Sequence, residues 1–224
     1  MKVDRDAWTK WQRWIARIQL DVQTTVNDQA QFDVFRDVVT ENAEWIGTND
    51  GAGFVYLVRG GFRAHAFMTI RRQVKEKDDA VSLMRLLNEV AEQSDQLTYE
   101  RYLGFHPRDP SIHEWQRDAF GKLSPNGVVV SKGLVEADRD RAKQLGASAE
   151  EIADREIAHL DPRGPEAKAT FDELRDCLYL FDELVVRYTR FFGGISFHDN
   201  SLKIRLPPDP RRVFRYPLVK PDRT

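Results

Sequence analysis

The chain has 224 residues, of which 31% are charged and 41% are hydrophobic, as is usual for a soluble globular domain. A formal net charge of −2 gives no global attraction to nucleic acid, so any such surface has to be local. The single cysteine, Cys177, excludes an intrachain disulfide framework and a cysteine-rich zinc site. With a charged first segment and no run of about 20 apolar residues, the sequence predicts a cytoplasmic protein without a signal peptide or a membrane span.

Helical periodicity dominates the first part of the chain. Apolar residues that step by three and four predict a first helix. Its stripe consists of Trp8, Trp11, Ile15, Ile18 and Val22. We expect a second helix after Asn27–Asp28, a third over about 54–75, and a fourth that starts near 78–79. The segment "TNDGAG" (48–53) is a turn signal between the second and third helices.

The segment 97–130 is the least regular part of the sequence. It contains the loop signals "HPRDPS" and "SPNG", and only 111–120 has a helical pattern. The run "VVVS" (128–131) is compatible with a short strand. We therefore interpret this segment as a loop-rich insertion that lies over a helical domain.

Helical periodicity resumes after this insertion. A helix is predicted over about 132–144, with its end at Gly146. The spacing S-x-x-E at 148–151 is a capping-box signature and predicts a short helix over about 149–160. A long helix with a heptad-like apolar stripe then runs from about Pro165 to Phe192.

These elements predict an all-α helical bundle over 1–194, with an extended basic tail over 195–224 that packs on or near it. The first helix carries more aromatic surface than a small bundle can bury, in Trp8, Trp11 and Trp14. We therefore expect a homodimer whose interface includes aromatic residues.

The stretch "DREIAHLD" (154–161) concentrates polar residues on a predicted helix. At 100° per residue, Ala153, Ile157 and Leu160 share one face, which we expect to contact the core. Arg155 and His159 are an i,i+4 pair on roughly the opposite face. This pair is either part of a solvated helix face or, if a partner subunit encloses it, part of a functional site.

Two segments resemble proteins of the HEPN family, in particular its abortive-infection subgroup. "IAHLD" after a polar, basic run is similar to the family's histidine element, and "FMTIRRQVKEKDDAVSLMRLL" (67–87) is similar to the helix pair that precedes it. The resemblance implies a dimeric helical bundle that acts as a metal-independent ribonuclease or RNA-binding protein in phage defence or a toxin–antitoxin pair. It also implies a cognate antitoxin or defence partner protein.

The same resemblance implies roles for individual residues. His159 would move a proton at the ribose 2′-hydroxyl and Arg155 would stabilise charge on the phosphate, roles that suit an imidazole and a guanidinium. Asp154 and Asp161 complete the predicted catalytic set.

The sequence departs from the family pattern at one position. Aligned on "IAH", Ala153 stands where the family has its arginine. Arg155 lies too close to the histidine for that position, because only three residues separate it from His159. Either Arg155 substitutes from the next turn, or the site has lost its catalytic arginine. In the second case the chain is a non-enzymatic binding or regulatory module that acts through a protein partner.

Two basic clusters are candidate RNA or phosphate contacts. Arg71 and Arg72, followed by Lys75 and Lys77, form a basic helix end, which either complements the helix dipole or contacts a phosphate beside His159.

The tail from 203 carries the second basic cluster. Its lysines and arginines are Lys203, Arg205, Arg211, Arg212, Arg215, Lys220 and Arg223. Of these, Arg211, Arg212 and Arg215 lie near Phe214 and Tyr216, so this segment could track an RNA backbone and stack its bases. The alternative is that the tail lies on its own subunit.

No metal site and no cofactor are expected. The histidines do not have the spacing of zinc ligands relative to one another, to the cysteine or to carboxylates. The chain also lacks a P-loop, a dinucleotide-binding glycine motif after a strand, and a nucleophile elbow.

Overall fold

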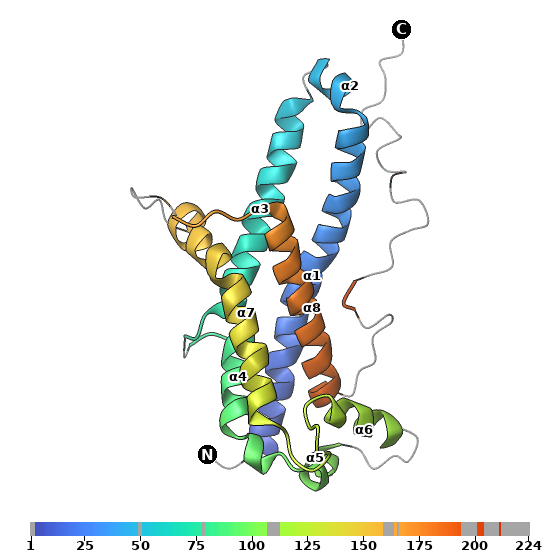
Figure 1. The fold of residues 1–224 in the computed structure, drawn as a ribbon, viewed down its shortest axis with the longest axis vertical. Helices are drawn as coiled ribbons and strands as arrows, with labels where there is room; N and C mark the ends of the chain where they lie inside the picture. The colour runs from blue at the N-terminus through green and yellow to red at the C-terminus, as the bar shows by residue number, and fades with distance from the viewer. Residues whose placement is uncertain are drawn as a thin grey trace.

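The computed structural model describes residues 3–48, 51–77, 79–106, 113–158, 164, 166–193, 201–203 and 211. Within these residues the protein is an all-α bundle, as the periodicity predicts (Figure 1). The segment 128–131, which is compatible with a short strand in sequence, contributes only an isolated bridge between Thr98 and Val129. Within the described part of the chain, no helix is both long and apolar enough to span a membrane.

The described helices account for most of the described residues. In chain order they are α1 (Arg5–Glu41), α2 (Ala43–Thr48), α3 (Ala52–Val74), α4 (Leu83–Glu92), the 3-10 helix η1 (Ser94–Gln96), α5 (Tyr99–Phe105), α6 (His113–Gly121), α7 (Lys132–Ile152), the π-helix η3 (Ala153–Ala158) and α8 (Phe171–Gly193). The insertion therefore contains α5, which the sequence did not predict, as well as the predicted α6.

Four long helices form the bundle. α1 packs along α8, α3 packs along α7, and α4 covers the lower half of α7 (Figure 1). α5 and α6 close one end, whereas α1 and α3 extend beyond α8 toward α2 at the other end. The core is apolar and runs through the whole bundle, with Trp8, Phe67, Leu87, Phe181 and Phe192 among its fully or almost fully buried side chains.

The predicted break at Asn27–Asp28 is wrong, because both residues lie inside α1, a continuous helix of 37 residues. Val26, Gln29 and Phe32 are buried on the same side of the helix, so the 3.6-residue periodicity is unbroken there. The Asp28 carboxylate lies 2.9 Å from His65 Nδ1 of α3, and its polar character serves that tertiary contact rather than a helix start.

The predicted helix end at Gly146 is also wrong. α7 runs on to Ile152, and the expected capping box at 148–151 lies inside the helix. Gly146 is buried against α3, where a Cβ would stand 2.6 Å from Val74 Cγ1. The glycine thus permits two helices to approach closely, which is its alternative use inside a helix.

The long helix α8 begins at Phe171 rather than at Pro165. A capping box formed by Thr170 and Glu173 defines this start. The backbone N–H of Glu173 donates to Thr170 Oγ1 at 3.2 Å, and the backbone N–H of Thr170 donates to Glu173 Oε2 at 2.7 Å.

The three tryptophans of α1 do not provide the exposed aromatic surface from which the sequence predicts a homodimer. Trp8 and Trp11 are buried, and the ring of Trp14 lies beneath the cations of Lys10 and Arg85. Four of the large apolar side chains that are exposed in the described residues lie instead on α2 and the first half of α3, namely Trp45, Phe54, Tyr56 and Leu57. The homodimer itself stays a prediction.

The described parts of the tail lie on their own bundle. Leu202 is buried, and its backbone N–H donates to Asp182 of α8 while its carbonyl accepts from Gln23 of α1. Arg211 pairs with Glu41 at the end of α1 at 2.9 Å. These contacts place the described tail residues against α1 and α8, and the packing of the tail as a whole stays a prediction.

Candidate functional site

The predicted catalytic cluster is described only in part. Asp154 and Arg155 lie on η3, directly after α7, whereas His159 and Asp161 lie outside the described residues. Ala153 is fully buried and Ile157 packs against the core, as the helix geometry predicts for that face. Because Ala153 is in the core, an arginine at this position would have to place its charge among apolar side chains.

Asp154 is bound to two cations of α3. It accepts a hydrogen bond from Arg71 Nε, and Lys75 Nζ lies 2.8 Å from its other carboxylate oxygen. Burial opposes ionisation of Asp154, but the hydrogen bonds from Lys75 and Arg71 outweigh it and lower the pKa of Asp154. Lys75 also pairs with Glu150 at 2.8 Å. The carboxylate therefore joins η3 to the end of α3.

Arg155 points away from this pair of cations. Its guanidinium donates to the Gly164 carbonyl at 3.2 Å and pairs with Glu151 at 3.4 Å and Glu166 at 3.7 Å. These contacts hold Gly164 and Glu166 near the end of α7. In the described part of the chain, both Asp154 and Arg155 thus make structural contacts.

A groove of about 800 Å³ opens beside this cluster. It lies between α1, the last two turns of α3 and the loop that leads to α4. Its basic lining consists of Arg17, Arg71, Arg72, Lys75 and Lys77, with His65 at one end, and its acidic lining consists of Asp21 and Asp79. The groove therefore contains the two arginines that the sequence marks as candidate phosphate contacts, and we call it the basic groove.

The charges of the basic groove are only partly neutralised. Arg72 donates to both carboxylate oxygens of Asp21, at 2.7 and 3.2 Å, and Arg71 and Lys75 are held by Asp154. Among the residues that the structure describes, Arg17 and Lys77 have no acidic partner, and both are exposed. These two cations are available to an anionic ligand.

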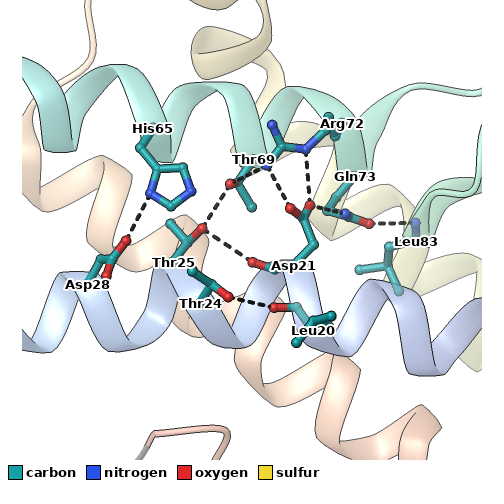
Figure 2. A network of polar contacts seen from close by, with 10 residues as sticks. All are labelled: Leu20, Asp21, Thr24, Thr25, Asp28, His65, Thr69, Arg72, Gln73 and Leu83. Atoms are coloured by element: carbon teal, nitrogen blue, oxygen red, sulfur yellow. Dashed lines mark hydrogen bonds and ion pairs between the residues drawn. The ribbon is translucent and has the colours of Figure 1, made fainter.

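A buried polar network fixes the walls of the basic groove (Figure 2). Thr25 of α1 and Thr69 of α3 are fully buried and share a hydrogen bond of 2.8 Å. Gln73 donates to Asp21 at 2.7 Å and accepts from the backbone N–H of Leu83, the first residue of α4. Because the Thr25–Thr69, Gln73–Asp21 and Gln73–Leu83 bonds join different helices, they help to set how α1, α3 and α4 lie relative to one another.

The sequence does not indicate the residues that α1 contributes to the basic groove. Arg17 and Asp21 line it beside residues of α3. The pairing of Asp21 with Arg72, about fifty positions later, has no signal in a single sequence. On α3, Arg59 lies over the ring of Phe171, and His65 pairs with Asp28 of α1.

The second predicted basic cluster is less available to an anionic ligand than the basic groove. Arg211 pairs with Glu41 and lies 4.0 Å from Asp37, so its charge is compensated by α1. Arg212 and Arg215 lie outside the described residues. Among the described residues, no three or more histidine, cysteine, aspartate or glutamate side chains lie together so that they could hold a metal ion.

Comparison of the chain with models of known protein families, with curated proteins and with solved structures finds no match. The resemblance to HEPN proteins therefore stays a prediction from the two motifs.

Proposed function

We propose that this protein is a cytoplasmic RNA-binding protein that holds a phosphate backbone in the basic groove. The observation that carries the proposal is the lining of that groove, in which Arg17 and Lys77 are unpaired among the described residues. Arg71, Arg72 and Lys75 surround them, and their carboxylate partners keep these side chains in fixed positions. Guanidinium and ammonium groups in such an arrangement favour a ligand with several phosphates.

Binding by ion pairs has a characteristic dependence on salt. Each phosphate that a lysine or arginine neutralises adds about −0.7 to the slope of log K against log salt for a single strand, because counterions are released. The two unpaired cations should therefore account for about −1.4 of that slope.

The test is a charge-removing double variant, Arg17→Gln with Lys77→Gln. Neither substitution breaks an ion pair among the described residues, so the fold should be unaffected. We expect weaker binding of a fluorescent single-stranded RNA and a flatter salt dependence. The matched control is Arg117→Gln with Lys168→Gln, two exposed cations outside the groove. Equal affinity of the test and control variants would contradict the proposal.

RNA cleavage is the stronger form of the same proposal. The contact between Arg71 and Asp154 supports it, since this contact joins the groove to the π-helix that precedes His159 in the chain. If the protein cleaves RNA, the product should end in a 2′,3′-cyclic phosphate, and His159→Ala should abolish its formation. Binding without cleavage would support the catalytically degenerate alternative.

Two exposed apolar side chains of α3, Tyr56 and Leu57, favour a second candidate function, self-association. Tyr56 is 82% exposed and Leu57 is 69% exposed, on the part of α3 that extends toward α2 (Figure 1). We propose a second copy of the chain as the occupant of this surface. Light scattering should give a dimeric mass, and Tyr56→Glu with Leu57→Glu should reduce it to that of a monomer. A monomeric mass of the unaltered protein would contradict this candidate.

A further inference from the structure

A second hollow, of about 380 Å³, adjoins the basic groove along α3. It lies between α1 and the middle of α3. His65 lines both hollows, so they meet at this side chain. The two hollows differ in chemistry, because the second one is lined mainly by aromatic residues. We call it the aromatic hollow.

Four phenylalanines shape the aromatic hollow. Phe32 and Phe62 are stacked with ring centroids 4.3 Å apart, and both are buried. Phe35 lies beside them, and Phe54 meets its ring edge to face at 6.3 Å. Phe54 is 56% exposed, so one aromatic ring in the wall remains open to a ligand. Exposed aromatic rings of this kind stack on planar groups.

His65 lies where the two hollows meet. Its Nδ1 lies 2.9 Å from the Asp28 carboxylate (Figure 2). A carboxylate only accepts hydrogen bonds, so Nδ1 is the atom that would donate in this pair. Asp28 thereby fixes the orientation of the ring between the basic groove and the aromatic hollow.

Gly61 keeps the aromatic hollow open. It lies in the middle of α3 and lines the hollow, and a Cβ built on it would meet no described atom within 4 Å. A glycine inside a helix costs about 1 kcal/mol relative to alanine, and close packing of a described helix does not explain it here.

We propose that the aromatic hollow binds one unpaired base of an RNA strand whose phosphates lie in the basic groove. This inference rests on the proposed function. A phosphate backbone and a stackable base are the two parts of a nucleotide, and the adjoining hollows match them in charge and in apolar character. A base in a duplex is paired and stacked, so the site selects single strands.

Two neighbouring glycines provide a matched test. Gly61→Leu fills the aromatic hollow, whereas Gly60→Leu places the same side chain on the adjacent helix position, which lines neither hollow. Both changes replace a helical glycine with a better helix former, so neither should unfold the protein. Circular dichroism and thermal melts check that both variants are folded.

We expect Gly61→Leu to bind single-stranded RNA about 5- to 150-fold more weakly, which corresponds to one stacked base. Gly60→Leu should bind like the unaltered protein, and the salt dependence of both should be unchanged because no charge is removed. The unaltered protein should prefer the single strand to a duplex of the same sequence.

Two results would overturn the inference. Suppose that Gly61→Leu binds RNA as tightly as Gly60→Leu, while the Arg17 and Lys77 double variant binds RNA more weakly. The aromatic hollow then binds no base, and the proposed phosphate binding in the basic groove is retained. If the unaltered protein binds no RNA at low salt, the proposed function fails, and the inference fails with it.

Discussion

Gly146 of α7 lies against Val74 of α3 so closely that a Cβ on the glycine would stand 2.6 Å from Val74 Cγ1. The same Cβ would lie 3.3 Å from Ile70 Cγ2. Both distances are shorter than the 3.5–4.0 Å at which carbon atoms attract each other. The glycine is therefore the residue that lets α3 and α7 meet, and α3 carries most of the basic groove.

Gly146→Ala should destabilise the protein although alanine is the better helix former. Overpacking costs about 1–3 kcal/mol, against about 1 kcal/mol gained in helix propensity. Gly60→Ala is the control, because its added methyl meets no described atom within 4 Å, and it should raise the free energy of unfolding by up to about 1 kcal/mol. Urea denaturation measures both changes.

The combination of Gly146→Ala with Val74→Ala tests the stated cause. Removing the valine methyls should relieve the clash, so the double variant should be more stable than the sum of the two single changes predicts. Additive effects would show that another contact limits the approach of α3 and α7.

Sequence periodicity predicted the fold class because long apolar stripes report burial directly. The predicted helix boundaries were wrong where one residue type has two structural uses. Asn27–Asp28 and Gly146 are typical of helix ends, but in this protein Asp28 binds His65 and Gly146 permits close helix packing. Both uses depend on a partner more than thirty residues away, which no local pattern contains. The start of α8 is different, since the capping box of Thr170 and Glu173 is visible in the sequence as T-x-x-E.

For the candidate site too, the sequence predicted a local feature and not the contacts between helices. Arg71 and Arg72 stood out as a local cluster of like charges. The pairing of Arg72 with Asp21, and the place of Arg17 in the same groove, arise only when α1 packs against α3. Asp154 was assigned to catalysis from a motif, and its described contacts are with Arg71 and Lys75.

The stability of the protein should fall as the pH drops below about 6.5. Burial lowers the pKa of His106, although a hydrogen bond to the Phe191 backbone opposes part of this shift. The folded state thus binds a proton at lower pH than the unfolded state, whose histidine titrates near 6.5. The stabilising contribution is present above that pH and is lost below it.

Urea denaturation between about pH 5 and pH 7.5 measures this effect, because that window brackets the unfolded-state pKa of histidine. His106→Gln keeps a hydrogen-bonding side chain without a titrating ring, so the pH dependence of its unfolding free energy should be weaker. An identical pH dependence in the variant would assign the titration to another group.

Cys177 should react with thiol reagents only when the protein unfolds. The side chain is fully buried in α8, and burial raises the pKa of its thiol to about 12. At pH 8 the reactive thiolate is therefore scarce as well as covered. Because Cys177 is the only cysteine, its labelling rate should follow the fraction unfolded across a denaturant series. Rapid labelling under native conditions would contradict the burial of this helix face.

Asp154→Asn should strengthen RNA binding if Asp154 restrains the cations of the basic groove. The change removes the negative charge that holds Arg71 and Lys75, and both are then free to meet phosphates. Each additional phosphate contact should steepen the salt dependence by about 0.7. The partly exposed ion pairs should cost only about 1 kcal/mol in unfolding free energy. Because Arg71 and Lys75 lower the pKa of Asp154, this contribution is present above the unfolded-state pKa near 3.8 and lost as the pH falls further.

Asp138→Asn is the matched control for this change. Asp138 of α7 binds Arg187 of α8 at 2.7 Å and accepts a hydrogen bond from Tyr188, so the variant loses the same charge in a similar pair. It lines no part of the basic groove. An equal gain in RNA affinity in both variants would show that the change in net charge, and not the release of Arg71 and Lys75, causes the effect. A loss of affinity in Asp154→Asn alone would mean that the carboxylate positions Arg71 and Lys75 for binding rather than withholding them.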